Sequence, residues 1–259
     1  MKLKHFQFLF FFSLLLVSEA EKDKKIIDDT STSIEKHSYL VSILFNGKHI
    51  CGGSLIKKNF VLTAAHCIPI LHHSHYSIRY GSNKVNSGGT VTKVTDITIH
   101  HNYNASTPFD YDIAILKTSN PIEGVNVIPI SIAVEEEYDI PFMLVGWGAL
   151  NSDETASNQL LEANVKMINR KTCQKMYVNK KITDRMICAA ANGKDACHGD
   201  SGRSVAHNGG LVGIVSWGRG CADQLYPDVY TNVAYFKDWI DGVLTDNSTM
   251  NIWNNNLNS

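Results

Sequence analysis

Residues 197–205 read CHGDSGRSV, and this stretch decides how the rest of the chain is interpreted. Residues 199–202 read Gly-Asp-Ser-Gly, a sequence that in many proteins surrounds a nucleophilic serine, here Ser201. A serine hydroxyl is a poor nucleophile at its ordinary pKa, so it needs a base that takes its proton during attack. The chain should therefore also contain a base and an acid that serve Ser201.

Two further motifs precede this stretch and supply candidates for both. Residues 63–67 read TAAHC, and residues 110–116 read DYDIAIL, with an acid at the head of an apolar run. Imidazole titrates near neutrality, so His66 can act as the base. A buried carboxylate at Asp112 would fix the imidazole tautomer. Each motif alone is a modest signal.

In the order His, Asp, Ser, the three motifs resemble those of trypsin-like serine proteases, from about Ile26 to Leu244. Residues 77–80, SIRY, and 213–218, GIVSWG, are especially similar to the group 3 trypsin-like allergens of mites. The resemblance implies an all-β fold of two antiparallel six-stranded β-barrels with a C-terminal α-helix. It also implies a catalytic triad of His66, Asp112 and Ser201.

The strand pattern agrees with an all-β fold. Short β-rich runs bounded by Gly, Asn and Ser recur at even spacing, which is typical of a sandwich or a pair of barrels. The runs are 39–45, 76–80, 90–98, 113–117, 141–147, 160–167 and 211–217. Residues 233–244 have apolar side chains at spacings of three and four, which predicts an amphipathic helix.

The resemblance also assigns the remaining parts of a protease site. The amides of Gly199 and Ser201 would form the oxyanion hole. The implied substrate-binding residues are Asp195, Ser216, Trp217, Gly218 and Asp228. Asp195 matches the acid at the pocket base that selects Arg or Lys, whereas Asp228 stands where trypsins place a glycine. Because two neighbouring carboxylates do not both ionise easily, we expect a narrower, still basic-selective pocket whose preference varies with pH.

The chain has six cysteines, an even number that favours disulfides in an exported protein, although spacing alone leaves their pairing open. The resemblance implies pairs of sequence neighbours: Cys51 with Cys67, Cys173 with Cys188, and Cys197 with Cys221. No metal and no cofactor are expected. The histidines at 72–75 and 100–101 suggest solvated surface, and residues 81–90, GSNKVNSGGT, lack the carboxylates of the family's calcium loop.

The N-terminal residues indicate export and activation. Residues 1–20 place two lysines before an apolar run that is too short for a membrane anchor, so we expect a cleaved signal peptide. Residues 21–25 would then be a propeptide. Its removal frees the Ile26 ammonium, which by resemblance pairs with Asp200.

The rest of the chain is expected to form one secreted, extracellular peptidase domain. It spans 26–245, with two barrel halves that meet near 125–135, and 246–259 form a disordered Asn-rich tail. Sequons at Asn104 and Asn247 are candidate glycosylation sites. The formal charge of −1 provides no basic stripe for nucleic acid. We expect a monomer without a membrane partner, with protein or peptide substrates and protease inhibitors as candidate partners.

The chain departs from the family pattern at Asp28-Asp29, Arg203, Ser204 and Asp228. Position 203 is an arginine where the family has glycine, and its long side chain must turn to solvent or push a neighbouring chain away. Either the strand exit is remodelled and the triad is intact, or the loop is displaced and the triad is a relic.

Two functions therefore stay open. One is an endopeptidase that cleaves after Arg or Lys through an acyl-enzyme on Ser201, and the other is a catalytically impaired paralogue that acts by binding or inhibition. Inactivated protease paralogues of the scabies mite are examples of the second. A small-ligand carrier would leave the ordered motifs unexplained.

Overall fold

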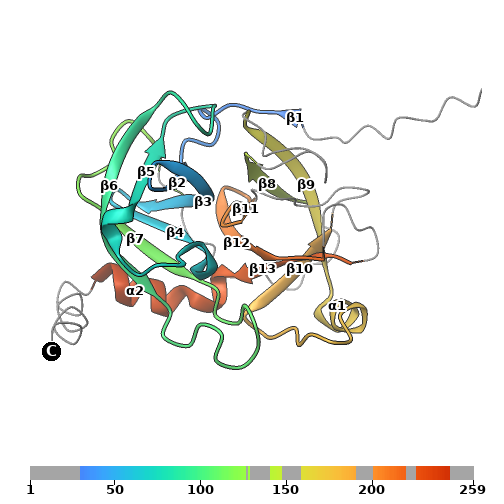
Figure 1. The fold of residues 1–259 in the computed structure, drawn as a ribbon. Coiled ribbons are helices and arrows are strands. Elements are labelled where there is room, and N and C mark those ends of the chain that lie inside the picture. The colour runs from blue at the N-terminus through green and yellow to red at the C-terminus, as the bar shows by residue number, and fades with distance from the viewer. Residues whose placement is uncertain are drawn as a thin grey trace, which may run out of the picture.

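The computed structural model describes residues 30–126, 128, 141–147, 159–190, 201–219 and 226–245. These residues form two antiparallel β-barrels, as predicted, and Figure 1 shows the barrels side by side with the C-terminal helix across one end of the first. No helix in these ranges is long and apolar enough to cross a membrane.

The first barrel is closed in the order β2-β3-β4-β7-β6-β5. Its strands are β2 (Leu40–Phe45), β3 (Lys48–Lys57), β4 (Phe60–Thr63), β5 (Tyr76–Tyr80), β6 (Thr90–Ile99) and β7 (Ala114–Thr118). Strands β2 and β4 are buried along almost their whole length. Their apolar side chains contribute to the core of this barrel, and β3 contacts β11 of the second barrel.

The second barrel is built on a seven-stranded sheet, in which β8 pairs with both β9 and β11 and so closes the ring. Its strands are β8 (Pro141–Gly146), β9 (Leu161–Ile168), β10 (Met186–Ala190), β11 (Ser204–His207), β12 (Gly210–Trp217) and β13 (Asp228–Asn232). The short strand β1 (Thr30–Ser31) adds to the edge of β9.

The helices are short. They are the 3₁₀ helices η1 (Ala65–Cys67), η2 (His73–His75) and η3 (Val233–Phe236), and the α-helices α1 (Arg170–Met176) and α2 (Lys237–Thr245). The helix predicted over 233–244 is present, but its first turn is the 3₁₀ helix η3. Helix α1 was not predicted, because its single buried side chain, Cys173, gives no apolar periodicity.

Two of the expected disulfides are present. Cys51–Cys67 joins β3 to η1, and Cys173–Cys188 joins α1 to β10. Cys197 and Cys221 lie outside the described residues. The first bond matters for function because it ties the turn that carries His66 to a central strand of the first barrel.

Each predicted strand coincides with an observed one within one or two residues. The strands that were not predicted are β1, β3, β4, β10, β11 and β13. Strand β3 was missed because Gly52 and Gly53 interrupt its apolar pattern. A Cβ atom on Gly53 would lie 2.7 Å from Val61 Cγ1 and 3.2 Å from Val41 Cγ2. Glycine is therefore required there by close packing of the neighbouring strands.

Candidate active site

His66 lies on η1, directly after β4, with its side chain 19% exposed. Its ring Nδ1 is 2.8 Å from Asp112 Oδ2, and its backbone N–H donates to Asp112 Oδ1 at 2.9 Å. A carboxylate accepts hydrogen bonds, so Nδ1 carries the proton of the neutral ring. The other nitrogen, Nε2, is then free to accept a proton.

Asp112 lies just before β7, and its side chain is 0% exposed. The second barrel supplies two further contacts: Ser216 Oγ donates to Asp112 Oδ2 at 2.5 Å, and Thr231 Oγ1 donates to the Asp112 carbonyl at 2.7 Å. A buried carboxylate is stable as an anion only where donors surround it. The contact between the two barrels therefore completes the environment of Asp112.

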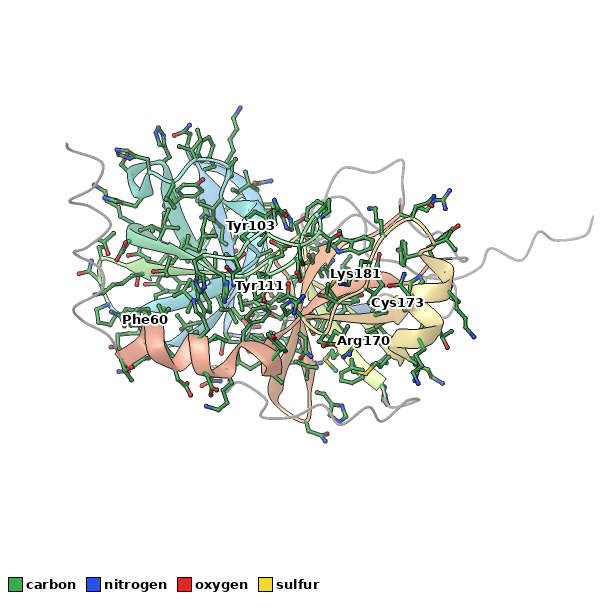
Figure 2. The ribbon with its side chains drawn as sticks, turned by 90° about the horizontal axis from the view of Figure 1, so that it is seen from below. Phe60, Tyr103, Tyr111, Arg170, Cys173 and Lys181 are labelled. Atoms are coloured by element: carbon green, nitrogen blue, oxygen red, sulfur yellow. A yellow bond between two sulfur atoms is a disulfide. The ribbon has the colours of Figure 1, made fainter. Side chains whose placement is uncertain are left out.

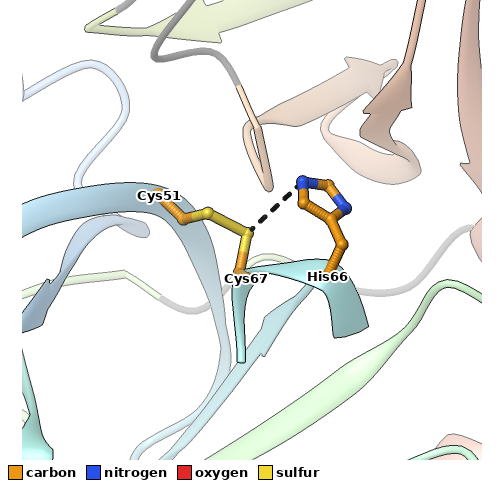
Figure 3. Close-up of side chains that lie close together, drawn as sticks. All are labelled: Cys51, His66 and Cys67. Carbon is orange, nitrogen blue, oxygen red and sulfur yellow. Dashed lines mark hydrogen bonds between the residues drawn. A yellow bond between two sulfur atoms is a disulfide. The ribbon is translucent and has the colours of Figure 1, made fainter. Parts of the chain in front are cut away.

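His66 also contacts the neighbouring disulfide. Figure 3 shows the ring nitrogen Nε2 facing Cys67 Sγ at 3.8 Å, with Cys51 behind it. These three side chains are the one cluster in the described part of the chain with metal-ligand spacing. Both sulfurs are consumed by the disulfide, so neither is the thiolate that a metal would require.

Ser201 and Gly202 form a turn that is held against both barrels. Gly52 N–H donates to the Ser201 carbonyl at 2.9 Å, and Gly202 N–H donates to the Val215 carbonyl at 3.0 Å. Gly202 has φ +75, and a Cβ there would lie 2.5 Å from the Gly52 carbonyl oxygen. Both the backbone angle and the close approach require glycine at this position.

Within the described residues, the His66 ring is hydrogen-bonded to Asp112 through Nδ1, and Ser201 is not among its hydrogen-bond partners. Its Nε2 lies 3.8 Å from Cys67 Sγ, a disulfide sulfur that has no proton to donate. Catalytic hydrogen bonds in substrate-free enzymes are often long and shorten when substrate binds. The first barrel thus holds His66 and Asp112 in contact, and Ser201 lies just before β11 of the second barrel.

Several expected site residues lie outside the described ranges: Ile26, Asp195, Gly199, Asp200 and Asn247. Asn104 is described, is exposed and has φ +61. Of the expected substrate-binding residues, Ser216, Trp217 and Gly218 follow one another at the end of β12. The Ser216 hydroxyl donates to Asp112, a contact that the sequence did not predict.

Asp228 begins β13 and is 5% exposed. Its Oδ1 lies so close to Gly218 that a Cβ at this glycine would collide with it. Strands β12 and β13 are paired here, with Trp217 opposite Val229. The Asp228 carboxylate therefore fills the space beside Gly218 that a glycine at position 228 would leave open.

Arg203 is 5% exposed, so its stem does not turn to solvent. It packs instead against Gly52 and Gly146: a Cβ on Gly52 would lie 3.1 Å from Arg203 Cγ, and one on Gly146 would collide with the arginine stem. The next residue, Ser204, is buried and its hydroxyl bonds to Ser54. Two glycines thus accommodate the arginine that the sequence analysis expected to disturb this region.

The strand that leaves the Ser201 turn is intact. In β11, Ser204 pairs with Ile214 of β12 on one side and with Val145 of β8 on the other. Within the part of this exit that the structure describes, residues 204–207 are therefore paired in the sheet.

An aromatic group that the sequence did not predict lies beside His66. Phe109 has φ +62, and its ring lies 5.8 Å edge-on from the His66 ring and 6.5 Å from Trp217. Lys180 Nζ is 4.3 Å from the Trp217 ring centroid. No local sequence pattern predicts a left-handed backbone at a phenylalanine, so this contact is seen only in the structure.

A pocket of about 300 Å³ lies nearby, and Lys180, which contacts the Trp217 ring, is one of its lining residues. It is lined by Met176, Tyr177, Val178, Asn179, Lys180, Gly218, Arg219 and Tyr226. Its charged lining is cationic, with the Arg219 guanidinium 4.2 Å over the Tyr226 ring.

Comparison with known proteins identifies the family. The family model described as Trypsin matches residues 26–240. Trypsin Blo t 3 of Blomia tropicalis is 41% identical over 228 residues, which cover 84% of this chain and 85% of that protein. Trypsin alpha of Drosophila melanogaster is 38% identical over 231 residues, covering 87% of this chain and 89% of that protein.

A solved structure agrees with these relatives. Neuropsin, a serine protease expressed in the limbic system of mouse brain, aligns with a TM-score of 0.76 and 30% identity, covering 84% of this chain and 99% of that one. The resemblance predicted from the three motifs is confirmed: the chain belongs to the trypsin family and is a trypsin-like serine endopeptidase.

Proposed function

We propose that this protein is secreted as a zymogen and, once cut after Lys25, hydrolyses peptide bonds after Arg or Lys through an acyl-enzyme on Ser201. The observation that carries the proposal is the buried Asp112 carboxylate, which binds both the ring and the backbone of His66. That arrangement leaves His66 Nε2 as the proton acceptor, on the side away from the carboxylate.

In the proposed reaction, Ser201 Oγ attacks the substrate carbonyl carbon while its proton moves to His66 Nε2. The charge that develops on the carbonyl oxygen is stabilised by the amides of Gly199 and Ser201. His66 then gives the proton to the departing amine as the peptide C–N bond breaks. Water, deprotonated by the same nitrogen, hydrolyses the acyl-enzyme and restores Ser201. Asp112 stays ionised throughout and stabilises the imidazolium.

The proposed specificity rests on two acids. Asp195 matches the family's pocket acid, and the buried Asp228 carboxylate narrows the space beside Gly218. We propose that these two carboxylates lie close together in the pocket, where they do not both ionise easily. We therefore infer a narrow pocket that takes a basic side chain, with a preference that changes with pH.

The proposed activation depends on the new N-terminus at Ile26, whose ammonium would pair with Asp200. Asp28-Asp29 replace the two glycines of the family pattern, and they restrict the backbone and add negative charge beside this ammonium. Activation should therefore be less favourable than in family members with glycine. The sequons at Asn104 and Asn247 are proposed glycan sites of the secreted protein.

The test is turnover by protein whose N-terminus has been confirmed as Ile26. Matched peptides that differ only in Arg, Lys or Phe before the cleaved bond should show cleavage after Arg and Lys. Ser201→Ala, prepared in the same way, is the control and should be inactive. A clear preference for Phe would overturn the specificity. Absence of any turnover in correctly processed protein would favour the impaired, partner-binding alternative.

A further inference from the structure

Residues 109–112, Phe-Asp-Tyr-Asp, adopt an unusual backbone. Phe109 and Tyr111 have φ of +62 and +54, in the left-handed region that bulky side chains rarely occupy. Such conformations persist only where the surrounding structure holds them. This segment also carries Asp112, so whatever holds it also sets the position of the carboxylate that binds His66.

The strongest anchor of the segment is Asp110, whose side chain is 0% exposed. It accepts two hydrogen bonds from Arg185, from Nε at 2.7 Å to Oδ1 and from Nη2 at 3.0 Å to Oδ2. Thr183 Oγ1 donates to Oδ1 at 2.8 Å, and the Ser106 hydroxyl donates to Oδ2. A bidentate guanidinium fixes both the position and the plane of the carboxylate.

The anchor crosses between the two barrels. Asp110 precedes β7 of the first barrel, whereas Thr183 and Arg185 precede β10 of the second. The Arg185 guanidinium also lies 4.5 Å over the Tyr111 ring, which Figure 2 places near the middle of the molecule. The centroid of a second ring, that of Tyr235, lies 5.7 Å from the Arg185 guanidinium carbon. Arg185 therefore holds two consecutive residues of the segment.

The segment reaches His66 at both of its ends. Phe109 contacts the imidazole ring edge-on at 5.8 Å, and Asp112 Oδ2 is 2.8 Å from Nδ1. Asp110 is next to Phe109 and is separated from Asp112 by Tyr111 alone. A shift of Asp110 would therefore move both residues that contact the imidazole. Small displacements of catalytic groups reduce the rate strongly.

We propose that Arg185 is a positioning residue: its bidentate bond to Asp110 holds residues 109–112 so that Phe109 and Asp112 orient His66, which links activity to the docking of the two barrels. The inference rests on the proposed function, in which His66 is the base. It differs from a purely structural role, in which loss of the ion pair would lower stability and leave the rate per folded molecule unchanged.

The test compares Arg185→Lys with Arg170→Lys. Lysine keeps the charge at 185 but loses the planar two-bond fork. Arg170 is a matched control: it also binds a carboxylate, Asp184, at 2.5 Å, but none of its described contacts reaches residues 109–112. Rates are expressed per active site, after titration with an irreversible inhibitor, so that unfolded protein does not count.

Arg185→Lys should lower kcat by about tenfold or more with KM changed less than about twofold, since the base and not the pocket is displaced. Arg170→Lys should match the unmodified enzyme. An unchanged kcat per active site in Arg185→Lys would overturn the proposal. If that variant does not fold, Asp110→Asn with Arg185→Gln leaves no buried charge unpaired. It should show the same loss of kcat, and full activity in it would contradict a positioning role.

A second readout does not depend on turnover. In a Ser201→Ala background, the proton on His66 Nδ1 gives a downfield NMR resonance that reports its bond to Asp112. This resonance should shift or broaden in Arg185→Lys and stay unchanged in Arg170→Lys. If the unmodified enzyme turns over no peptide, the proposed function fails, yet the resonance still tests the positioning. An identical resonance in both variants would overturn it.

Discussion

Asp110 and Asp112 are two aspartates on one short segment, and their side chains are equally inaccessible, each 0% exposed. They differ in what holds them. Asp110 faces the guanidinium of Arg185, which stays charged at every relevant pH. Asp112 faces an imidazole and the Ser216 hydroxyl.

This difference separates anchoring from catalysis. A guanidinium gives Asp110 a fixed ion pair that cannot pass a proton on. An imidazole can gain a proton on its far nitrogen, and Asp112 is placed to stabilise the resulting cation. Loss of Asp112 should therefore reduce the rate by removing the partner of the imidazole. Loss of Asp110 should reduce stability and, through the position of Asp112, lower the rate by a smaller factor.

The largest expected effect is that of Asp112→Asn. The amide can donate to His66 Nδ1, so the ring adopts the wrong tautomer and Nε2 no longer accepts the serine proton. We expect kcat to fall by about 10⁴, the loss that this change causes in other serine proteases. Steady-state kinetics on an arginyl peptide measures it. A loss of only tenfold would mean that Asp112 does not orient the base.

Asp110→Asn should have the next largest effect, on stability. Breaking a buried ion pair by removing one partner costs about 3–5 kcal/mol, because the remaining charge is left uncompensated. Urea unfolding at neutral pH measures the difference in free energy. If Asp110→Asn were as stable as the unmodified protein, the distinction between the two aspartates would be lost.

The same variant should change how stability depends on pH. Burial raises the pKa of Asp110, but hydrogen bonds from Arg185, Ser106 and Thr183 outweigh burial and hold the pKa below its ordinary value. A lowered pKa in the folded state stabilises the protein above the ordinary aspartate pKa of about 3.9, and this contribution is lost as the pH falls through the folded-state pKa. In Asp110→Asn, the free energy of unfolding should therefore fall less as the pH is lowered. Urea unfolding at several pH values measures this difference.

Ser216→Ala removes one donor from Asp112 without changing the imidazole contact. Hydrogen bonds to charged groups contribute about 1.5–3 kcal/mol, so we expect kcat to fall by roughly tenfold to a hundredfold. The peptide assay measures it, with circular dichroism as the check on folding. A kcat equal to that of the unmodified enzyme would show that Asp112 does not need the second barrel.

Thr183→Val is expected to have the smallest effect. Asp110 keeps Arg185 and Ser106, so the loss should be about 1 kcal/mol of stability with kcat almost unchanged. Thermal unfolding and the peptide assay measure the two quantities. A larger change in kcat than in Ser216→Ala would reverse the assignment of roles to the two aspartates.

The sequence predicted the parts of this molecule that depend on local pattern or on family motifs. β-rich runs bounded by Gly, Asn and Ser located strands such as β5 and β12. The motifs brought His66 and Asp112 together before their contact was seen. The family pattern also gave the pairing of Cys51 with Cys67 and of Cys173 with Cys188.

What it could not predict depends on residues far apart in the chain. Arg203 was expected to disturb its neighbourhood, yet Gly52 and Gly146 leave room for its stem. The bond between Asp110 and Arg185 spans 75 positions, and although Asp110 begins the DYDIAIL stretch, nothing in that stretch indicates Arg185 as its partner. Left-handed conformations at Phe109 and Tyr111 are likewise set by tertiary contacts and have no signature in the residues themselves.

The most direct test of the central claim is covalent labelling by a serine-directed phosphonate of protein whose N-terminus is Ile26, followed by peptide mapping. We expect one adduct, on Ser201, with Asp110→Asn labelled more readily than Asp112→Asn. Unlabelled Ser201 in correctly processed, folded protein would contradict it.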